Sequence, residues 1–368
     1  MISFFKQKID DQILNKIYSY FNKDNWVNGN ITSKFEIKLK KFLRIKHNVI
    51  SCNSGSDALL ISLLLNKKKN KNIYLTTPIS YVASASIPKF LNLKLIYIDV
   101  EKDNFLMSID KLEFFLKTCP KNIRKKINGI INVELFGQTS DLIRLNKIAK
   151  KYNLSLIGDC AQSLGTKYKN KSTVNYYDYA ITSFYPTKIL SCYGDGGALF
   201  FKEKYEKVFL LKNNGHNLKN KSLCSQIGIN SRLDSIQAFI LNKEIDKIKN
   251  VIIRRKKIFK LYKKLIKSNS KLFKINHENK NLIINNYIYP LFINKFYRLK
   301  FLKHMKKNGV ECKIFYSKML PSNKVLKPFI KTNISNARRC TQELICIPSS
   351  ENLKKKEVIK IIKAINNF

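Results

Sequence analysis

Apolar and polar residues follow two kinds of pattern along the chain. Short apolar runs of strand length recur between residues 35 and 245, and segments with helical spacing separate several of them. The runs predict strands at residues 47–53, 72–78, 94–100, 127–137, 154–159, 176–186 and 196–202. Helical spacing predicts helices at residues 54–65, 81–92 and 141–153. This alternation predicts an α/β fold with a mostly parallel central sheet that helices cover on both faces.

The pattern changes after about residue 245. A long basic helix, an apolar run and two further helices are predicted at residues 241–267, 287–293, 297–309 and 354–368. This order is typical of a smaller α+β domain, and 368 residues suit two packed domains. We therefore expect a large domain at 1–245 and a small C-terminal domain at 246–368, with the long helix bridging them.

The chain is strongly basic, with 70 Lys and Arg against 25 Asp and Glu and a formal charge of +45. Clustered basic residues would indicate nucleic-acid binding, because they neutralise phosphates. Here they are spread along the chain, and Asn and Ile are overused with Lys. Those three residue types share A/T-rich codons, so a biased genome explains the composition better. We therefore expect no specific nucleic-acid partner.

Other classes of protein are disfavoured by the sequence. The longest apolar run, at 58–65, is far shorter than the roughly 20 residues of a membrane span. No secretory signal pattern opens the sequence. The eight cysteines form no CxxC pair and the four histidines do not cluster with them, so no metal site is expected. A reduced, cytoplasmic protein without a membrane span is the expectation.

Polar residues follow the ends of several predicted strands, where ligands of open α/β sheets bind. The segments at these ends contain Gly55, Ser56, Tyr81, Asp159, Gln162, Ser183 and Lys188. Gly55 and Ser56 begin a helix, where free N–H groups favour a phosphate, although Ser also caps helices for local reasons. Tyr81 suits either stacking on a flat ring or burial in the core.

Asp159 and Lys188 suggest a more specific chemistry. A carboxylate at the end of an apolar strand needs a cation, which a protonated ring nitrogen or a lysine can supply. At about 4 Å and an effective dielectric constant near 20, such a pair attracts by about 4 kcal/mol. Lys188 precedes the glycines Gly194, Gly196 and Gly197, which an ordinary surface lysine does not need. Phosphate site, ring stacker, carboxylate and amine together predict a site for pyridoxal phosphate.

Four segments carry a resemblance to a known family: SFYPTKILSCYGDGGAL, GDCAQSLGTKYKNK, ELFGQTSDL and GINSRLDSIQA. They resemble the DegT/DnrJ/EryC1/StrS family of sugar aminotransferases, over nearly the whole chain. The resemblance implies the fold-type I architecture of enzymes that depend on pyridoxal phosphate, and a homodimer with shared active sites. It also implies a ping-pong transfer in which Lys188 carries the cofactor and moves protons as general acid and base.

The same resemblance implies roles for the other site residues. Asp159 would face the pyridinium nitrogen, Gln162 the ring oxygen, and Tyr81 the ring face. Gly55, Ser56 and Ser183 would bind the phosphate, and Asn230 would reach the phosphate of the neighbouring subunit. Arg232 and Tyr316 would contact the substrate.

The motifs look most like the branch that aminates C3 of a UDP- or dTDP-linked 3-oxo sugar, with L-glutamate as donor, for surface polysaccharide such as lipopolysaccharide O-antigen. C4 amination of a 4-keto-6-deoxy nucleotide sugar is the main alternative, and a non-catalytic regulatory protein is another. Two departures stand out. Gly158 replaces the first acid of the pattern E-D-A-A-Q, and Phe315 stands where relatives often have a histidine before the tyrosine.

Overall fold

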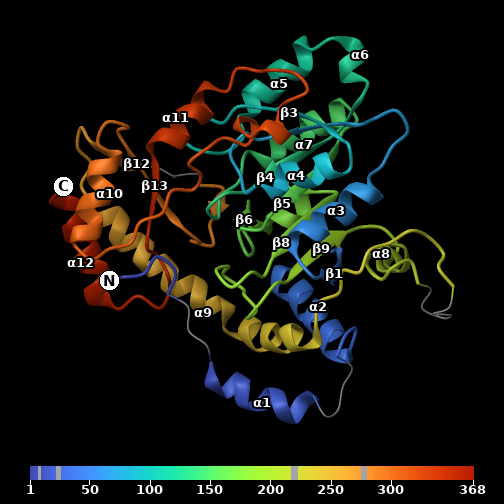
Figure 1. Ribbon diagram of the computed structural model, residues 1–368, viewed down its shortest axis with the longest axis horizontal. Helices are drawn as coiled ribbons and strands as arrows, with labels where there is room; N and C mark the ends of the chain where they lie inside the picture. Colours follow the sequence, from blue (N-terminus) through green and yellow to red (C-terminus); the bar gives the residue numbers. More distant parts are fainter. Residues whose placement is uncertain (7–9, 22–25, 217–222, 275–279) are drawn as a thin grey trace.

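The computed structural model describes residues 1–6, 10–21, 26–216, 223–274 and 280–368. Its centre is a seven-stranded sheet with the order β1-β9-β8-β5-β4-β2-β3 (Figure 1). These strands are β1 (Asn48–Cys52), β2 (Ile73–Thr76), β3 (Lys94–Tyr97), β4 (Ile127–Val133), β5 (Ser155–Asp159), β8 (Tyr179–Ser183) and β9 (Gly197–Phe201). Only β9 runs antiparallel to its neighbours, so the predicted, mostly parallel sheet is confirmed.

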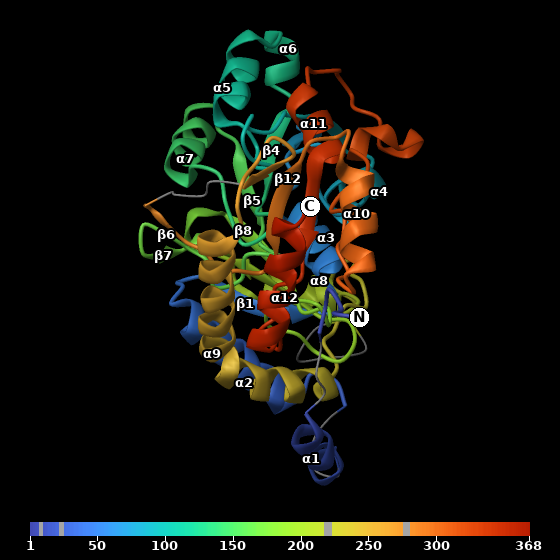
Figure 2. The same ribbon diagram turned by 90° about the vertical axis from the view of Figure 1, so that its left-hand side faces the viewer.

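Helices cover both faces of this sheet, as the sequence pattern predicted. Figure 2 shows α5 and α7 on one side of the strands and α3 and α4 on the other. Every residue of β4 is buried, Asn128 and Asn132 included, as expected for a central strand that is covered on both faces. Asp141 caps α7 by accepting hydrogen bonds from the N–H groups of Ile143 and Arg144. The helices of this part are α1 (Asp11–Phe21), α2 (Asn30–Leu43), α3 (Gly55–Leu65), α4 (Ala83–Phe90), α5 (Ile109–Thr118), α6 (Lys121–Arg124), α7 (Leu142–Lys151) and α8 (Tyr205–Lys212).

A second, smaller buried cluster lies in the C-terminal part. It joins a three-stranded antiparallel sheet to helices α10 and α12 and to the second half of α9. The elements are α9 (Ser235–Leu265), β10 (Leu272–Lys274), β12 (Tyr289–Ile293), α10 (Arg298–Lys307), α11 (Ser335–Glu343), β13 (Leu344–Ile347) and α12 (Lys355–Asn366). A short sheet joins β6 (Lys167–Tyr168), β7 (Lys171–Ser172) and β11 (Leu282–Ile283).

Helix α9 connects the two buried clusters. Its residues Phe239 and Ile248 pack in the large cluster, and Phe259 and Tyr262 pack in the small one. The helix begins at Ser235, six residues before the predicted start, and the expected boundary between 245 and 246 falls within it. We keep the two-domain division as a proposal in which α9 is shared by both sides.

Among the described residues, no helix has the length and apolar character needed to cross a membrane. The same residues contain no group of three His, Cys, Asp or Glu side chains that could hold a metal ion.

Candidate active site

The predicted site residues gather at one edge of the central sheet. Strands β1, β2, β4, β5 and β8 all point their carboxyl ends toward this edge, because β9 alone is reversed. Asp159 ends β5, Ser183 ends β8, and Gly55 begins the helix that follows β1. The parallel arrangement therefore brings together segments that lie more than 100 residues apart in the sequence.

Asp159 is a buried carboxylate that is held by neutral groups. One oxygen accepts a hydrogen bond from the Ser84 hydroxyl at 2.7 Å, and the other accepts from the Ala161 N–H at 3.2 Å. Burial raises the pKa of Asp159, and these two donors and the charge of Lys188 only partly oppose that rise. A protonated ring nitrogen placed against this carboxylate would supply the missing positive charge, so the residue fits the pyridinium of pyridoxal phosphate.

The first turn of α3 has the features of an anion site. Ser54 caps the helix by accepting a hydrogen bond from the Asp57 N–H at 3.1 Å. The N–H groups of Gly55 and Ser56 come earlier in the turn, where no intrahelical acceptor exists. A side chain on Gly55 would lie 3.1 Å from Cβ of Ser183, so glycine lets the end of β8 approach the helix. The predicted phosphate residues therefore lie together, as a phosphate group requires.

Gly197 explains part of the glycine cluster that follows Lys188. A Cβ atom at this position would lie 2.3 Å from the carbonyl carbon of Ser54 and 2.4 Å from the nitrogen of Gly55. Real Cβ atoms do not approach backbone that closely, so only glycine lets β9 pass behind the first turn of α3. Gly197 thus allows close packing at the anion site, at the start of α3, and not within the loop that contains Lys188.

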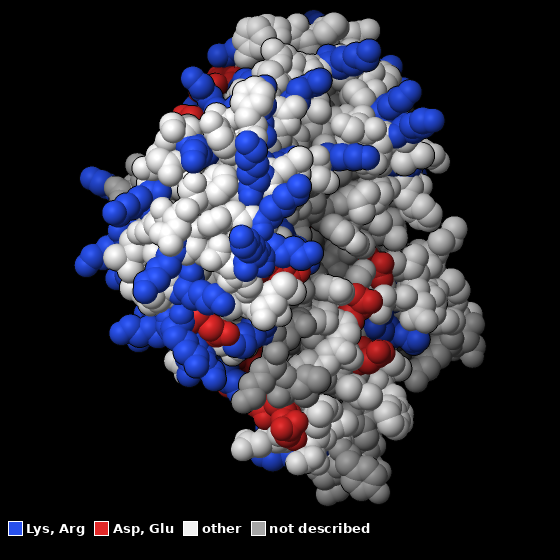
Figure 3. Space-filling view, turned by 60° about the vertical axis from the view of Figure 1, so that its left-hand side comes forward, with Lys and Arg blue, Asp and Glu red and all other residues white. Residues whose placement is uncertain are grey.

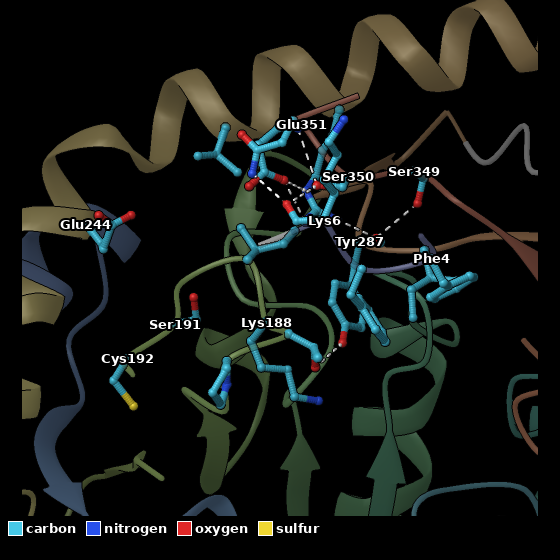
Figure 4. A pocket seen from close by; sticks show the side chains of 18 of the residues that line it. Phe4, Lys6, Lys188, Ser191, Cys192, Glu244, Tyr287, Ser349, Ser350 and Glu351 are labelled. Carbon is cyan, nitrogen blue, oxygen red and sulfur yellow. Dashed lines mark hydrogen bonds and ion pairs between the residues drawn. The ribbon is translucent and has the colours of Figure 1, made fainter. Parts of the chain in front are cut away.

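Lys188 lies in the loop after β8, beside an aromatic ring from a distant segment. Its Nζ atom is 5.4 Å from the centre of the Tyr287 ring, and the Tyr287 hydroxyl is 3.4 Å from that of Thr187. A cavity of about 270 Å³ adjoins the lysine. It is bounded by residues 4–6 of the N-terminal arm, the loop at 186–193, helix α9 and residues 349–352. Figure 4 shows Lys188 at one end of this cavity and Glu351 at the other, close to α9.

Gln162 and Tyr316 form a direct contact between the two parts of the chain. The Gln162 amide donates to the Tyr316 hydroxyl at 3.1 Å and accepts from the Phe136 N–H at 2.9 Å. Phe315, at the position where relatives often have histidine, packs its ring 5.7 Å from that of Phe4. The N-terminal residue Phe4 therefore packs directly on Phe315. A histidine at 315 would place a polar ring in this contact.

The remaining predicted residues lie at the border of the site. Tyr81 is 62% exposed, which excludes a core role, and its carbonyl accepts from the N–H of Ser84, the residue that bonds to Asp159. Asn230 is exposed, and Arg232 is half-buried with an Nε atom that has no hydrogen-bond partner among the described residues. Ser231, between them, donates to Asp57 at 2.8 Å. This bond anchors the segment 230–232 beside the first turn of α3.

A second buried carboxylate, Glu134, follows β4 directly beside Asp159. It accepts hydrogen bonds from the hydroxyls of Ser163, Thr173 and Tyr177, and its backbone N–H bonds to the Asp159 carbonyl at 3.0 Å. Burial raises its pKa, because no cation lies among these partners. Sequence reasoning missed this residue, as it missed Ser84 and Tyr287, since no local motif distinguishes them.

The sheet order, the lysine loop and the carboxylate at the end of β5 define a pyridoxal-phosphate-dependent aminotransferase of fold type I. The pattern of the DegT/DnrJ/EryC1/StrS aminotransferase family matches residues 7–366. The chain therefore belongs to this family, and the predicted fold, enzyme class and cofactor are confirmed.

Individual relatives show how broad this family is. The chain is 32% identical over 252 residues, 68% of each protein, to UDP-2-acetamido-2-deoxy-3-oxo-D-glucuronate aminotransferase of Pseudomonas aeruginosa. It is 25% identical to UDP-4-amino-4,6-dideoxy-N-acetyl-β-L-altrosamine transaminase of Campylobacter jejuni, covering 99% of this chain and 96% of that one. It is also 29% identical to the pleiotropic regulatory protein of Geobacillus stearothermophilus, over 71% and 68% of the two chains.

Solved structures show the same architecture. A family member from Brucella abortus superposes with a TM-score of 0.88 at 25% identity, over 97% of this chain and 94% of that one. An aminotransferase of pseudoaminic acid biosynthesis from Helicobacter pylori gives a TM-score of 0.89 over both full chains at 21% identity, a likeness of fold alone.

Proposed function

We propose that this enzyme moves an amino group from L-glutamate to a keto sugar linked to a nucleotide, at C3 of a UDP- or dTDP-linked 3-oxo sugar. The observation that carries the proposal is the buried Asp159. Two neutral donors bond to it, and the charge of Lys188 is close enough to lower its pKa against the effect of burial. A carboxylate in this setting is suited to a cationic ring, and a lysine beside it is suited to a carbonyl group.

The proposed cofactor contacts come from several elements. Asp159 would accept a hydrogen bond from the protonated ring nitrogen, and Tyr81 would stack on the ring. The N–H groups of Gly55 and Ser56 donate to the phosphate, together with the Ser183 hydroxyl. Gln162 binds the ring oxygen from the side where its amide already meets Tyr316.

When bound, pyridoxal phosphate supplies a ring that accepts the electron pair released when a substrate carbon loses its proton. The chain's own residues handle that proton. Lys188 takes it from the α carbon of glutamate through Nζ, and in the second half of the exchange it returns a proton to the sugar carbon that receives nitrogen. Asp159 holds the ring nitrogen protonated during both halves, and Ser84 and the Ala161 N–H keep the carboxylate oriented.

Further parts of the proposal concern the substrate and the assembly. Arg232 and Tyr316 contact the sugar nucleotide, and an arginine suits its diphosphate. A homodimer with shared sites is supported by the exposed Ile227, which is 94% exposed and lies near Asn230, the residue proposed to reach the neighbouring subunit's phosphate. The aminated sugar nucleotide is proposed to enter the synthesis of a surface polysaccharide.

Similarity favours C3 over C4, because the 32% identical relative is named for a 3-oxo sugar. The Campylobacter relative is named for a 4-amino sugar at 25% identity, so C4 amination is the second candidate. The regulatory alternative rests on the name of the Geobacillus relative. Both Lys188 and Asp159 are present in the sheet-edge arrangement, which supports catalysis.

The half-reaction with glutamate tests the proposal first. Purified protein should show a yellow absorption band that glutamate bleaches with release of 2-oxoglutarate, and Lys188→Ala should show neither change. Lys318→Ala, at an exposed position, is the matched control and should behave as wild type. A Lys188→Ala variant that still turns over glutamate would refute the assignment.

Product analysis then decides the ring position. UDP- and dTDP-linked 3-oxo and 4-oxo sugars are supplied separately to the glutamate-treated enzyme, and NMR locates the new amino group. Amination of only the 4-oxo sugars would establish the C4 alternative. A protein that neither binds the cofactor nor bleaches would support the regulatory reading.

A further inference from the structure

Positive charge is distributed unevenly between the two parts of the chain. Residues 246–368 carry 31 Lys and Arg against 6 Asp and Glu, whereas residues 1–245 carry 39 against 19. The net charge is therefore +25 on 123 residues and +20 on 245 residues. A codon bias that acts on the whole chain raises lysine everywhere, so it does not explain why the C-terminal part has more than twice the charge density.

The basic residues of this part gather on one surface in space. Helix α12 packs between α9 and α10, and the His304 ring of α10 bonds to the Ala364 carbonyl of α12 at 2.8 Å. Figure 2 shows the three helices side by side on the outside of the molecule, and Figure 3 shows this side covered by Lys and Arg with few acids. We define the basic face as the exposed lysines of α10 and α12, which are Lys300, Lys303, Lys306, Lys307, Lys355, Lys356, Lys360 and Lys363.

These lysines are available to an external anion. None of the eight forms an ion pair with a carboxylate in the part of the chain that the structure describes. The acids nearest in the sequence are already paired, Glu357 with Lys6 at 2.8 Å, Glu351 with Arg255 at 2.7 Å and Glu311 with Lys313 at 2.5 Å. The face therefore combines high charge with little internal neutralisation.

Two large apolar side chains, one just before α10 and one in its first turn, lie beside these lysines in the sequence. Phe296 is 75% exposed and Leu299 is 70% exposed, and Nζ of Lys295 lies 5.0 Å from the centre of the Phe296 ring. On α10, Leu299 and Lys303 are four residues apart and share one helix face. Exposed Phe and Leu among lysines are the composition of helices that lie in a membrane interface.

We propose that the basic face docks this enzyme on the surface of a bilayer that contains anionic phospholipid. Each lysine near such a surface strengthens binding by about fivefold. Phe296 and Leu299 add apolar contacts with the acyl region, which a ligand that offers only phosphates does not have. Every exposed Lys or Arg position on α10 and α12 is a lysine, and Arg298 of α10 is half-buried, whereas arginine is preferred where phosphates are read in a fixed geometry. These features favour a bilayer over a nucleic acid.

This docking is separate from the proposed amino transfer. On α9, Val251 and Arg255 line the cavity beside Lys188, whereas the basic face lies on α10 and α12, none of whose residues borders that cavity. Substitutions on the face therefore leave the catalytic arrangement untouched, and membrane binding and transamination can fail independently.

The test uses full-length protein loaded with pyridoxal phosphate and vesicles of phosphatidylcholine with or without 30 mol% phosphatidylglycerol, in about 0.1 M salt. Cosedimentation should occur with the anionic vesicles only. The triple variant Lys300→Gln, Lys303→Gln, Lys306→Gln should weaken partitioning by roughly two orders of magnitude. Equal binding of the variant and the wild type would overturn the proposal, as would absence of wild-type binding.

A matched control separates the face from net charge. The triple variant Lys121→Gln, Lys125→Gln, Lys126→Gln loses the same charge at exposed positions around α6, which Figure 1 places away from α10 and α12. It should bind vesicles as wild type does, and both triple variants should keep the wild-type cofactor absorbance, unfolding temperature and glutamate half-reaction. Equal losses in the two triple variants would mean that net charge alone drives binding and would refute a docking face.

A second pair of variants distinguishes a bilayer from a nucleic acid. Phe296→Ser with Leu299→Ser keeps every lysine and should weaken vesicle binding about tenfold or more, because each side chain loses its apolar burial. Binding to a 20-base-pair duplex, if any, should be unaffected by this change. A duplex that binds more tightly than the vesicles, together with vesicle binding insensitive to both serines, would assign the face to nucleic acid instead.

Discussion

A methyl group added at Gly197 should damage the anion site without touching a proposed catalytic residue. In Gly197→Ala the new Cβ would lie 2.3 Å from the carbonyl carbon of Ser54 and 2.4 Å from the nitrogen of Gly55. Ordinary contacts begin near 3.4 Å, so either β9 or the first turn of α3 must move by about 1 Å. All three of the nearest atoms are backbone, and no side-chain rotation can relieve the clash.

The size of the effect follows from two contributions. Overpacking of this kind costs about 1–3 kcal/mol of folding stability. Displacing the first turn of α3 also misaligns the N–H groups of Gly55 and Ser56, and a hydrogen bond to a charged group contributes about 1.5–3 kcal/mol. Loss of one such bond weakens cofactor binding by roughly 10-fold to 150-fold.

Gly194→Ala is the matched control, because it adds the same methyl group in the loop that leads into β9. Its nearest neighbour would be the Gln237 side-chain nitrogen at 3.1 Å, and that amide can move. Fluorescence titration with pyridoxal phosphate and thermal unfolding of the apoprotein should separate the two variants, with Gly194→Ala close to wild type. Wild-type affinity and stability in Gly197→Ala would refute the role assigned to this glycine.

Three further predictions concern buried polar groups. Burial raises the pKa of Glu134, so the folded protein holds this proton more tightly than the unfolded chain and loses stability as pH rises above the unfolded value of about 4.3. The unfolding temperature of Glu134→Gln relative to wild type should therefore be higher at pH 8 than at pH 5, and an equal difference at both would contradict this. Tyr316→Phe leaves the Gln162 amide without its acceptor and should cost about 1–3 kcal/mol of unfolding free energy in denaturant titrations, whereas a neutral result would mean that water replaces the hydroxyl. Arg255→Ala strands the carboxylate of Glu351 and should cost about 3–5 kcal/mol, while Arg255→Ala with Glu351→Ala should recover part of that loss.

The fold could be predicted from the sequence because its strands are buried on both faces. A segment such as β4, with seven buried residues in succession, admits few alternatives to a central strand. The start of α9 was placed six residues too late, and the loop before it is held to α3 by the hydrogen bond from Ser231 to Asp57. Helices α1, α2, α5, α6, α8 and α11 were not among the predicted elements.

The site could be predicted only where chemistry and strand ends coincide. Asp159 ends β5, and Lys188 lies in the loop after the neighbouring parallel strand β8, so both were expected at the same edge of the sheet. Ser84 and Tyr287 contact these two residues from segments about 75 and 100 positions away. Such contacts depend on how α4 and the segment before β12 pack, and hydrophobic periodicity carries no information about that packing.

The glycine at 158 shows how a departure from a family pattern can be balanced within the fold. A Cβ at Gly158 would lie 2.5 Å from the ring of Tyr177, which is fully buried and donates its hydroxyl to Glu134 at 2.7 Å. No acid can therefore occupy position 158 while the tyrosine keeps its place. The buried carboxylate beside Asp159 is supplied instead by Glu134, from the end of the neighbouring strand, and its backbone bond to the Asp159 carbonyl links the two positions. An acid at 158 therefore requires that Tyr177 move or change, and Tyr177 is in turn bonded to Glu134.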